Sequence, residues 1–355
     1  MPLLLDTAKS AAAVELRSAN CITIGLVNNM PDAALEATKR QFVDLIRAAA
    51  TGCVVRLKLF AMADVPRSAR ARENLAGRYR DVAELWNERL DGLIVTGTEP
   101  RAKDLEDEPY WAALTAIVDG AREHTASTIW SCLAAHAAVL HSDGIVRRPL
   151  KEKLSGVFDC DTVAALPQLP IGAPRLRVPH SRYNDLPERV LTGSGYHVLT
   201  RSAAAGVDMF ARVERHSLFV FLQGHPEYDG GSLLREYRRD VGRFLRGERE
   251  HYPALPQGYF DEGATAAAKA FRKLAQGERQ DEIMRDFPLA ALEAGLAAAD
   301  AGGESDWRPS AVGIYQSWID YLKERRAAGK AGRWSPRPRP LAAGGIAGRA
   351  AKWGE

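Results

Sequence analysis

Residues 127–140 read Ser-Thr-Ile-Trp-Ser-Cys-Leu-Ala-Ala-His-Ala-Ala-Val-Leu, and this stretch is the most informative part of the chain. Residues 127–131 are typical of a buried parallel strand, and residues 133–140 favour an alanine-rich helix. A nucleophile in so sharp a strand-to-helix turn projects beyond the edge of the sheet. Cys132 occupies this turn, where the free N–H groups at the start of the helix stabilise a thiolate. Taken alone, Cys132 is also compatible with a buried structural cysteine.

Alternating strand and helix patterns continue on both sides of this turn. They predict an α/β fold with a doubly wound, mostly parallel sheet and a helical C-terminal extension. Strands are expected at residues 22–27, 54–60, 93–96, 127–131 and 218–222, and helices at 35–49, 110–123, 133–140, 232–246, 263–299 and 314–324. Residues 158–184 contain four prolines and show no clean period. We therefore expect an irregular flap of loops and short antiparallel pieces over the site there.

A second motif follows the apolar strand at residues 218–222. It reads Gln-Gly-His-Pro-Glu-Tyr from Gln223, so His225 stands at the carboxyl end of a strand, where open α/β sheets place their sites. Glu227 can orient the imidazole, and Cys132, His225 and Glu227 then form a nucleophile, a base and an orienting group. The alternative is a histidine in a surface turn beside an unrelated glutamate. His136, one helical turn after Cys132, is a rival base, which we interpret as a packed or helix-capping residue.

Charge and cysteine content narrow the possible functions. The formal net charge is +3, but the segment from Gly329 onward holds six Lys or Arg residues against Glu355, a net of +5. The rest of the chain is therefore close to −2 and has no basic bias for nucleic acid. Four cysteines with no CxxC pair indicate free thiols in a reducing compartment, with no disulfide framework, metal site or bound cofactor.

The ends of the chain suggest its organisation. Asp6, Lys9 and Glu15 interrupt any signal-peptide pattern, and no apolar stretch is suited to a membrane, so we expect a cytoplasmic protein. We divide the chain into an N-terminal arm (1–20), one large domain (21–325) and a disordered basic tail (326–355), because the tail has few large apolar residues.

With these motifs, the sequence resembles class-I glutamine amidotransferases. It resembles more closely the homoserine O-acyltransferase family, the homoserine O-succinyltransferases. The resemblance covers about residues 20–325, and two of its motifs are not amidotransferase features, Glu-Lys-Leu-Ser-Gly at 152–156 and Pro-His-Ser-Arg-Tyr at 179–183. The other matching segments are Asn29-Met30-Pro31, Asp91 to Gly97, Pro109-Tyr110-Trp111 and Gly224 to Asp229.

The resemblance implies a class-I amidotransferase-like (flavodoxin-like) fold and a two-step transfer in methionine biosynthesis. Cys132 would take an acyl group, succinyl in our prediction, from acyl-CoA, and the homoserine hydroxyl would attack that thioester with His225 as base. Lys153, Ser181 and Arg239 fall on the substrate-binding positions of the family. Arg101 falls on a position associated with donor choice, where a small residue goes with succinyl and an acidic residue with acetyl. The implied partners are homoserine and acyl-CoA, and a homodimer is possible.

Other functions remain open from the sequence. Thr98-Glu99 replaces the Ala-Pro pair that the family has after Thr-Gly, so an acetyl donor or a serine-type acceptor is an alternative. A class-I glutaminase or amidase would use the same three catalytic residues, although such domains usually have glycine before the cysteine and this chain has Ser131. A non-catalytic binding module is a further alternative.

Overall fold

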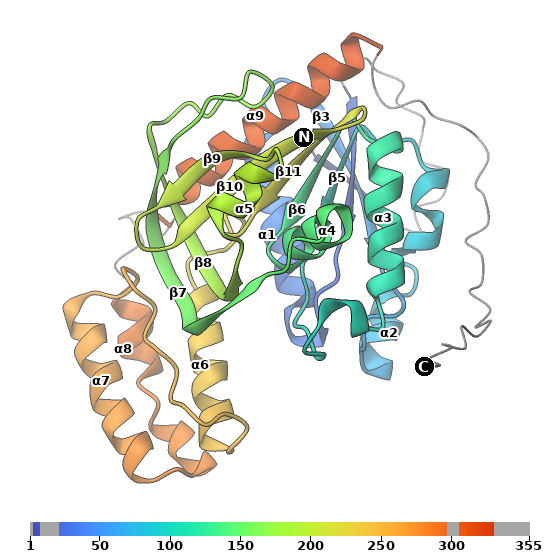
Figure 1. The fold of residues 1–355 in the computed structure, drawn as a ribbon. Helices are drawn as coiled ribbons and strands as arrows, with labels where there is room; N and C mark the ends of the chain where they lie inside the picture. The colour runs from blue at the N-terminus through green and yellow to red at the C-terminus, as the bar shows by residue number, and fades with distance from the viewer. Residues whose placement is uncertain (1–2, 8–20, 297–304, 330–355) are drawn as a thin grey trace, which may run out of the picture.

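The computed structural model describes residues 3–7, 21–296 and 305–329, and the expected arm (1–20) and tail (326–355) lie largely outside these ranges. One mixed sheet runs through the molecule (Figure 1). Its parallel part has the order β1 (Leu3–Asp6), β3 (Val54–Ala61), β2 (Cys21–Val27), β5 (Gly92–Val95), β6 (Ser127–Ser131) and β11 (Ser217–Leu222), with the short β4 (Arg80–Asp81) beside β3. The predicted α/β class with a mostly parallel, doubly wound sheet is confirmed.

Helices cover both faces of the parallel part. On one face, α1 (Asp32–Ala49) packs beside α9 (Arg308–Ala327), and their apolar side chains share a core with β2 and β3. On the other face, α3 (Trp111–His124) and α4 (Leu133–Asp143) form a second core with β5, β6 and β11. Shorter helices lie in the connections, namely α2 (Ala69–Leu75), η1 (Val82–Asn87), η2 (Leu105–Asp107) and α5 (Glu188–Gly193). Buried strands such as β5 and β11 therefore read as nearly continuous apolar runs.

The other half of the sheet is antiparallel. Beyond β11 it continues through β10 (Gly206–Glu214), β9 (His197–Ser202), β7 (Arg148–Thr162) and β8 (Arg175–Asp185). The expectation of an irregular flap at 158–184 is wrong for most of that range, because β7 and β8 pair from Leu154–Arg182 to Asp161–Arg175. Pro179 is tolerated because β8 is an edge strand, where a missing N–H breaks no ladder. Only the connection 163–174 lacks strand structure.

A helical lobe follows the last strand. It consists of α6 (Ser232–Leu245), α7 (Glu262–Gly277), η3 (Asp281–Asp286) and α8 (Leu289–Ala294), which enclose a third apolar core (Figure 1). The helix predicted for residues 263–299 is therefore broken after Gly277, and its last three residues lie outside the described ranges. α9 then returns to the sheet. No helix in the described ranges is long and apolar enough to cross a membrane.

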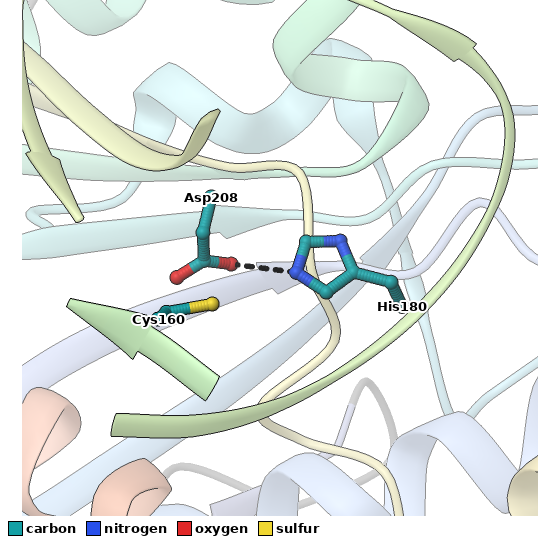
Figure 2. Close-up of side chains that lie close together, drawn as sticks. All are labelled: Cys160, His180 and Asp208. Carbon is teal, nitrogen blue, oxygen red and sulfur yellow. Dashed lines mark ion pairs between the residues drawn. The ribbon is translucent and has the colours of Figure 1, made fainter. Parts of the chain in front are cut away.

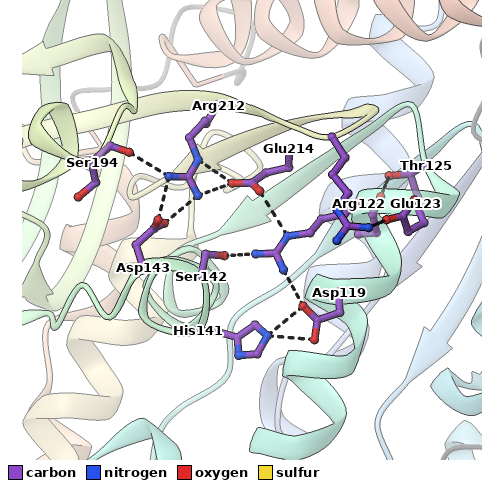
Figure 3. A network of polar contacts seen from close by, with 12 residues as sticks. Asp119, Arg122, Glu123, Thr125, His141, Ser142, Asp143, Ser194, Arg212 and Glu214 are labelled. Atoms are coloured by element: carbon purple, nitrogen blue, oxygen red, sulfur yellow. Dashed lines mark hydrogen bonds and ion pairs between the residues drawn. The ribbon is translucent and has the colours of Figure 1, made fainter.

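A polar network ties α3 and α4 to the β10–β11 hairpin (Figure 3). Arg212 contacts Asp143 at the end of α4, with Nη2 2.8 Å from Oδ2, and it also pairs with Glu214. Glu214 contacts Arg122 of α3, whose guanidinium also reaches Ser142. The end of α4 remote from Cys132 is thereby fixed to β10, which pairs with β11, the strand that leads to His225.

Candidate active site

Cys132 lies between β6 and α4 with an unusual backbone conformation. Its φ is 50° and its ψ is −112°, values that L-residues rarely adopt and that are found where the surrounding structure enforces them. The Cys132 N–H donates to the Leu222 carbonyl oxygen at 2.7 Å, so the end of β11 holds the turn. The side chain is partly exposed and faces a cavity of 590 Å³. This geometry matches the nucleophile turn predicted from the sequence.

His225 and Glu227 follow β11 and lie at the same cavity. The His225 Nδ1 is 2.8 Å from the Glu227 Oε1, and Glu227 is buried, with 4% of its side chain exposed. The ring of Tyr228 stacks on the imidazole at 4.3 Å between centroids. Burial acts to lower the pKa of His225, but the charges of Cys132 and Glu227 and hydrogen bonds with both raise this pKa well above its ordinary value. The structure thus brings the three predicted side chains together.

Gly97 packs directly against the start of α4. A Cβ atom at Gly97 would lie 3.0 Å from the backbone nitrogen of Leu133, closer than ordinary contact. Thr96 holds this segment in place, because its Oγ1 accepts the Asn29 N–H at 2.8 Å. The Leu133 N–H belongs to the first turn of α4, where helices leave N–H groups without intrahelical partners. These N–H groups can stabilise an oxyanion formed beside Cys132.

His136 has a different environment from His225. It is buried, and its Nε2 lies 2.9 Å from the Oε1 of Gln223. Burial lowers the pKa of His136 to about 3, so the ring is neutral at physiological pH. The interpretation of His136 as a packed residue is confirmed, and it is poorly suited to act as a base.

The three predicted substrate-binding residues line the same cavity. The Lys153 Nζ lies 2.9 Å from Glu236 and 2.8 Å from Asp240, and the Ser181 hydroxyl donates to Glu236. Arg239 is paired with Asp240 at 3.1 Å, and 41% of its side chain is exposed. These residues therefore form one polar cluster beside the catalytic groups.

The sequence interpretation missed Glu236, which is central to this cluster. It also accepts a hydrogen bond from the Tyr228 hydroxyl at 2.6 Å. Burial acts to raise the pKa of Glu236, but the charge of Lys153 and the hydrogen bonds from Ser181 and Tyr228 lower it to about 2. The available signal was its spacing from Arg239, because residues three apart share one face of a helix.

Arg101 is exposed at the rim of the cavity. Its backbone N–H and that of Ala102 both donate to the Oε1 of Glu108, which fixes the loop after Gly97. Glu99 lines the same cavity and forms two contacts with Arg243, at 2.5 and 3.0 Å. A hydrogen bond from Arg243 lowers the pKa of Glu99, so this carboxylate is ionised and already paired.

A buried polar cluster lies behind the site, formed by Cys160, His180 and Asp208 (Figure 2). Their ligand-type atoms lie within 4.8 Å of one another, a set that could hold a metal ion. His180 Nε2 is already 3.2 Å from Asp208 Oδ1, and burial lowers the pKa of His180. The preceding residue, Pro179, accepts the His225 N–H at 2.7 Å, so this cluster supports the loop that carries the base. Sequence spacing gave no sign of this cluster, because its members stand on three different strands, β7, β8 and β10.

Comparison with known proteins decides the family. The family model described as homoserine O-succinyltransferase matches residues 6–328. The chain belongs to the homoserine O-succinyltransferase family. It is 54% identical to the homoserine O-succinyltransferase of Rhodopseudomonas palustris over 85% of this chain and 88% of that protein. It is 48% identical to the protein of the same name from Methylorubrum extorquens, over 86% and 88%. The predicted family, and with it an acyltransferase of methionine biosynthesis, is confirmed.

Solved structures give a weaker likeness. A glutamine amidotransferase from Thermotoga maritima is 12% identical, with a TM-score of 0.42, over 85% of this chain and 98% of that one. A glutamine amidotransferase from Methylobacillus flagellatus is 17% identical, with a TM-score of 0.44, over 86% and 96%. Likenesses of this size support no statement about activity, and the homoserine O-succinyltransferase family provides the functional comparison.

Proposed function

We propose that this protein transfers a succinyl group from succinyl-CoA to the hydroxyl of homoserine through a thioester on Cys132. The observation that carries this proposal is the Cys132–His225–Glu227 arrangement in a cavity of a homoserine O-succinyltransferase family member. A cysteine at a helix start beside an oriented histidine is the arrangement that nucleophilic catalysis requires.

The reaction has two steps in this proposal. In the first, the Cys132 thiolate attacks the thioester carbonyl of succinyl-CoA, and CoA leaves as a thiol after taking a proton from the His225 imidazolium. In the second, the homoserine hydroxyl gives its proton to His225 as its oxygen attacks the acyl-cysteine, and the Cys132 thiolate leaves. The Leu133 N–H and the backbone near Gly97 stabilise the negative oxygen in both steps. Glu227 holds the imidazole and stabilises its charged form.

The polar cluster beside Cys132 suits a zwitterionic acceptor. We propose that Arg239 binds the carboxylate of homoserine, because a guanidinium can bind a carboxylate through two hydrogen bonds. Glu236 is ionised and offers a partner for the α-ammonium group. Lys153 and Ser181 fix Glu236 and thereby position the acceptor.

The choice of succinyl-CoA rests on the family and on the loop after Gly97. Glu99, the acidic side chain that could repel a succinyl carboxylate, is paired with Arg243. Arg101 adds a positive charge at the rim of the cavity. Replacing Arg101 with Glu should therefore erode the preference for succinyl-CoA over acetyl-CoA, measured as a ratio of kcat/KM, by roughly 1–3 kcal/mol. An unchanged ratio would remove Arg101 from donor selection.

The test of the proposal is a matrix of donors and acceptors. Purified protein is supplied with succinyl-CoA or acetyl-CoA, each with homoserine or serine, and separately with glutamine alone. We expect O-succinylhomoserine as the main product. Preference for acetyl-CoA, for serine, or ammonia release from glutamine would each replace the proposal with the corresponding alternative. No turnover with any pair, together with a Cys132 that iodoacetamide does not alkylate, would favour a binding module. A cytoplasmic location and a homodimer stay predictions.

A further inference from the structure

The cations around the catalytic cavity fall into two groups. Five of them already have partners in the structure, namely Arg67 with backbone carbonyls, Lys153 with Glu236 and Asp240, Arg182 with Asp185, Arg239 with Asp240, and Arg243 with Glu99. Two guanidinium groups, those of Arg101 and Arg147, form no hydrogen bond or ion pair with any other residue in the described ranges. Arg101 is exposed, whereas Arg147 is only partly exposed.

The chain directs Arg147 into the cavity. After α4 ends at Asp143, Gly144 adopts a left-handed conformation, and its N–H donates to Leu140. The next residues alternate in burial, because Ile145 is buried, Val146 is 68% exposed, Arg147 is partly buried and Arg148 is exposed again. Arg147 lines the cavity that holds Cys132, whereas Arg148 does not.

The electrostatic setting of Arg147 suits an anionic group. Burial lowers the pKa of Arg147, and Tyr110, Cys132 and Glu108 act in the opposite direction. Glu108 and Asp104 are the carboxylates that act on Arg147, but in the described ranges neither forms an ion pair with it, and the Glu108 Oε1 accepts the N–H groups of Arg101 and Ala102. A partly desolvated guanidinium without a partner gains more from an incoming carboxylate than an exposed one does.

We propose that Arg147 binds the terminal carboxylate of the succinyl group and is the main residue that selects a dicarboxylic acyl donor. This inference rests on the proposed function, because it assigns one end of the donor whose other end reacts at Cys132. Two methylene groups separate the thioester carbonyl of succinyl-CoA from its carboxylate, so both ends of the acyl group must lie within one cavity. Arg147 and Cys132 line the same cavity. A guanidinium binds a carboxylate through two parallel hydrogen bonds, which discriminates against a donor that ends in a methyl group.

The experiment compares succinyl-CoA with butyryl-CoA, which replaces the carboxylate with a methyl group, at saturating homoserine. Arg147→Gln should lower kcat/KM for succinyl-CoA by roughly 10- to 100-fold and change the value for butyryl-CoA far less. Arg147→Lys should recover part of the loss, because it keeps the charge and loses the paired hydrogen bonds. Arg148→Gln is the matched control. In this variant the ratio of kcat/KM for succinyl-CoA to kcat/KM for butyryl-CoA should equal that of the wild type.

Four other outcomes would contradict this role of Arg147, and each points to a different explanation. An equal loss for both donors would mean that Arg147 binds the CoA phosphates or supports the fold. A ratio that responds to Arg101→Gln and not to Arg147→Gln would assign the carboxylate to the rim. If Arg147→Gln does not fold, Arg147→Lys must still lower the ratio, or the inference is wrong. A wild-type protein that transfers no succinyl group overturns the proposed function, whereas succinyl transfer with an unchanged ratio in Arg147→Gln overturns this inference alone.

Discussion

Replacing Glu227 with Gln tests how the base is held. The Glu227 Oε1 lies 2.8 Å from the His225 Nδ1, and the carboxylate is almost fully buried. The amide oxygen of Gln can still accept from Nδ1, but the negative charge that stabilises the imidazolium is lost. A hydrogen bond to a charged group contributes about 1.5–3 kcal/mol, so kcat/KM should fall by about 10- to 150-fold. The loss should be smaller than that caused by His225→Ala, which removes the base itself.

The assay is the pH dependence of kcat/KM for Glu227→Gln, His225→Ala and the control Glu250→Gln, whose side chain is 88% exposed. Because Glu227 helps to raise the pKa of His225, the limb of the profile that belongs to His225 should move to lower pH in Glu227→Gln. Melting temperatures are measured in parallel to detect any loss of stability. In Glu227→Gln the amide nitrogen would take the place of the Glu227 Oε2, which has no hydrogen-bond partner in the described ranges. An unchanged kcat/KM, or a loss larger than that of His225→Ala, would refute the assigned roles.

Three further predictions concern stability and the end of the chain. Burial lowers the pKa of His136 from the value of about 6.5 that the side chain has in the unfolded chain. The free energy of unfolding that depends on a neutral His136 is therefore lost as the pH falls below about 6.5. Between pH 7 and pH 5 the wild type should therefore lose about 2 kcal/mol more than His136→Gln in urea unfolding, and parallel curves would contradict this. Arg326→Ala should lower the unfolding free energy by about 1–3 kcal/mol, because Arg326 pairs at 2.7 Å with buried Asp91; an unchanged denaturation midpoint would contradict it. Removing residues 330–355 should leave kcat unchanged, since the family match ends at residue 328, and a loss at saturating substrate would show that the tail reaches the site.

Much of the parallel half of the fold could be predicted from the sequence, because buried parallel strands are short, continuous apolar runs between amphipathic helices. β6 and α4 begin and end close to the predicted residues. The antiparallel half could not be predicted as well. β7 and β8 carry prolines and charged residues along an edge of the sheet, so their apolar pattern is weak, and their structure depends on pairing between distant segments.

The candidate site shows the same division. Cys132 and His225 could be found because each lies just after a buried strand, and all such strand ends meet at one edge of a parallel sheet. Glu236 and Arg147 gave no comparable signal. Glu236 stands in a highly charged helix, and Arg147 lies in the short connection between α4 and β7, next to a second arginine. Their importance depends on which charged side chains around the cavity already have partners. Those contacts are known only from the three-dimensional structure.

The most direct test of the mechanism is the covalent state of Cys132. Protein is mixed with succinyl-CoA in the absence of homoserine, and its intact mass is measured before and after homoserine is added. We expect a single succinyl adduct that maps to Cys132, disappears when homoserine is added, and is absent from Cys132→Ala but present in Cys53→Ala. An adduct on another residue, or turnover by Cys132→Ala, would contradict it.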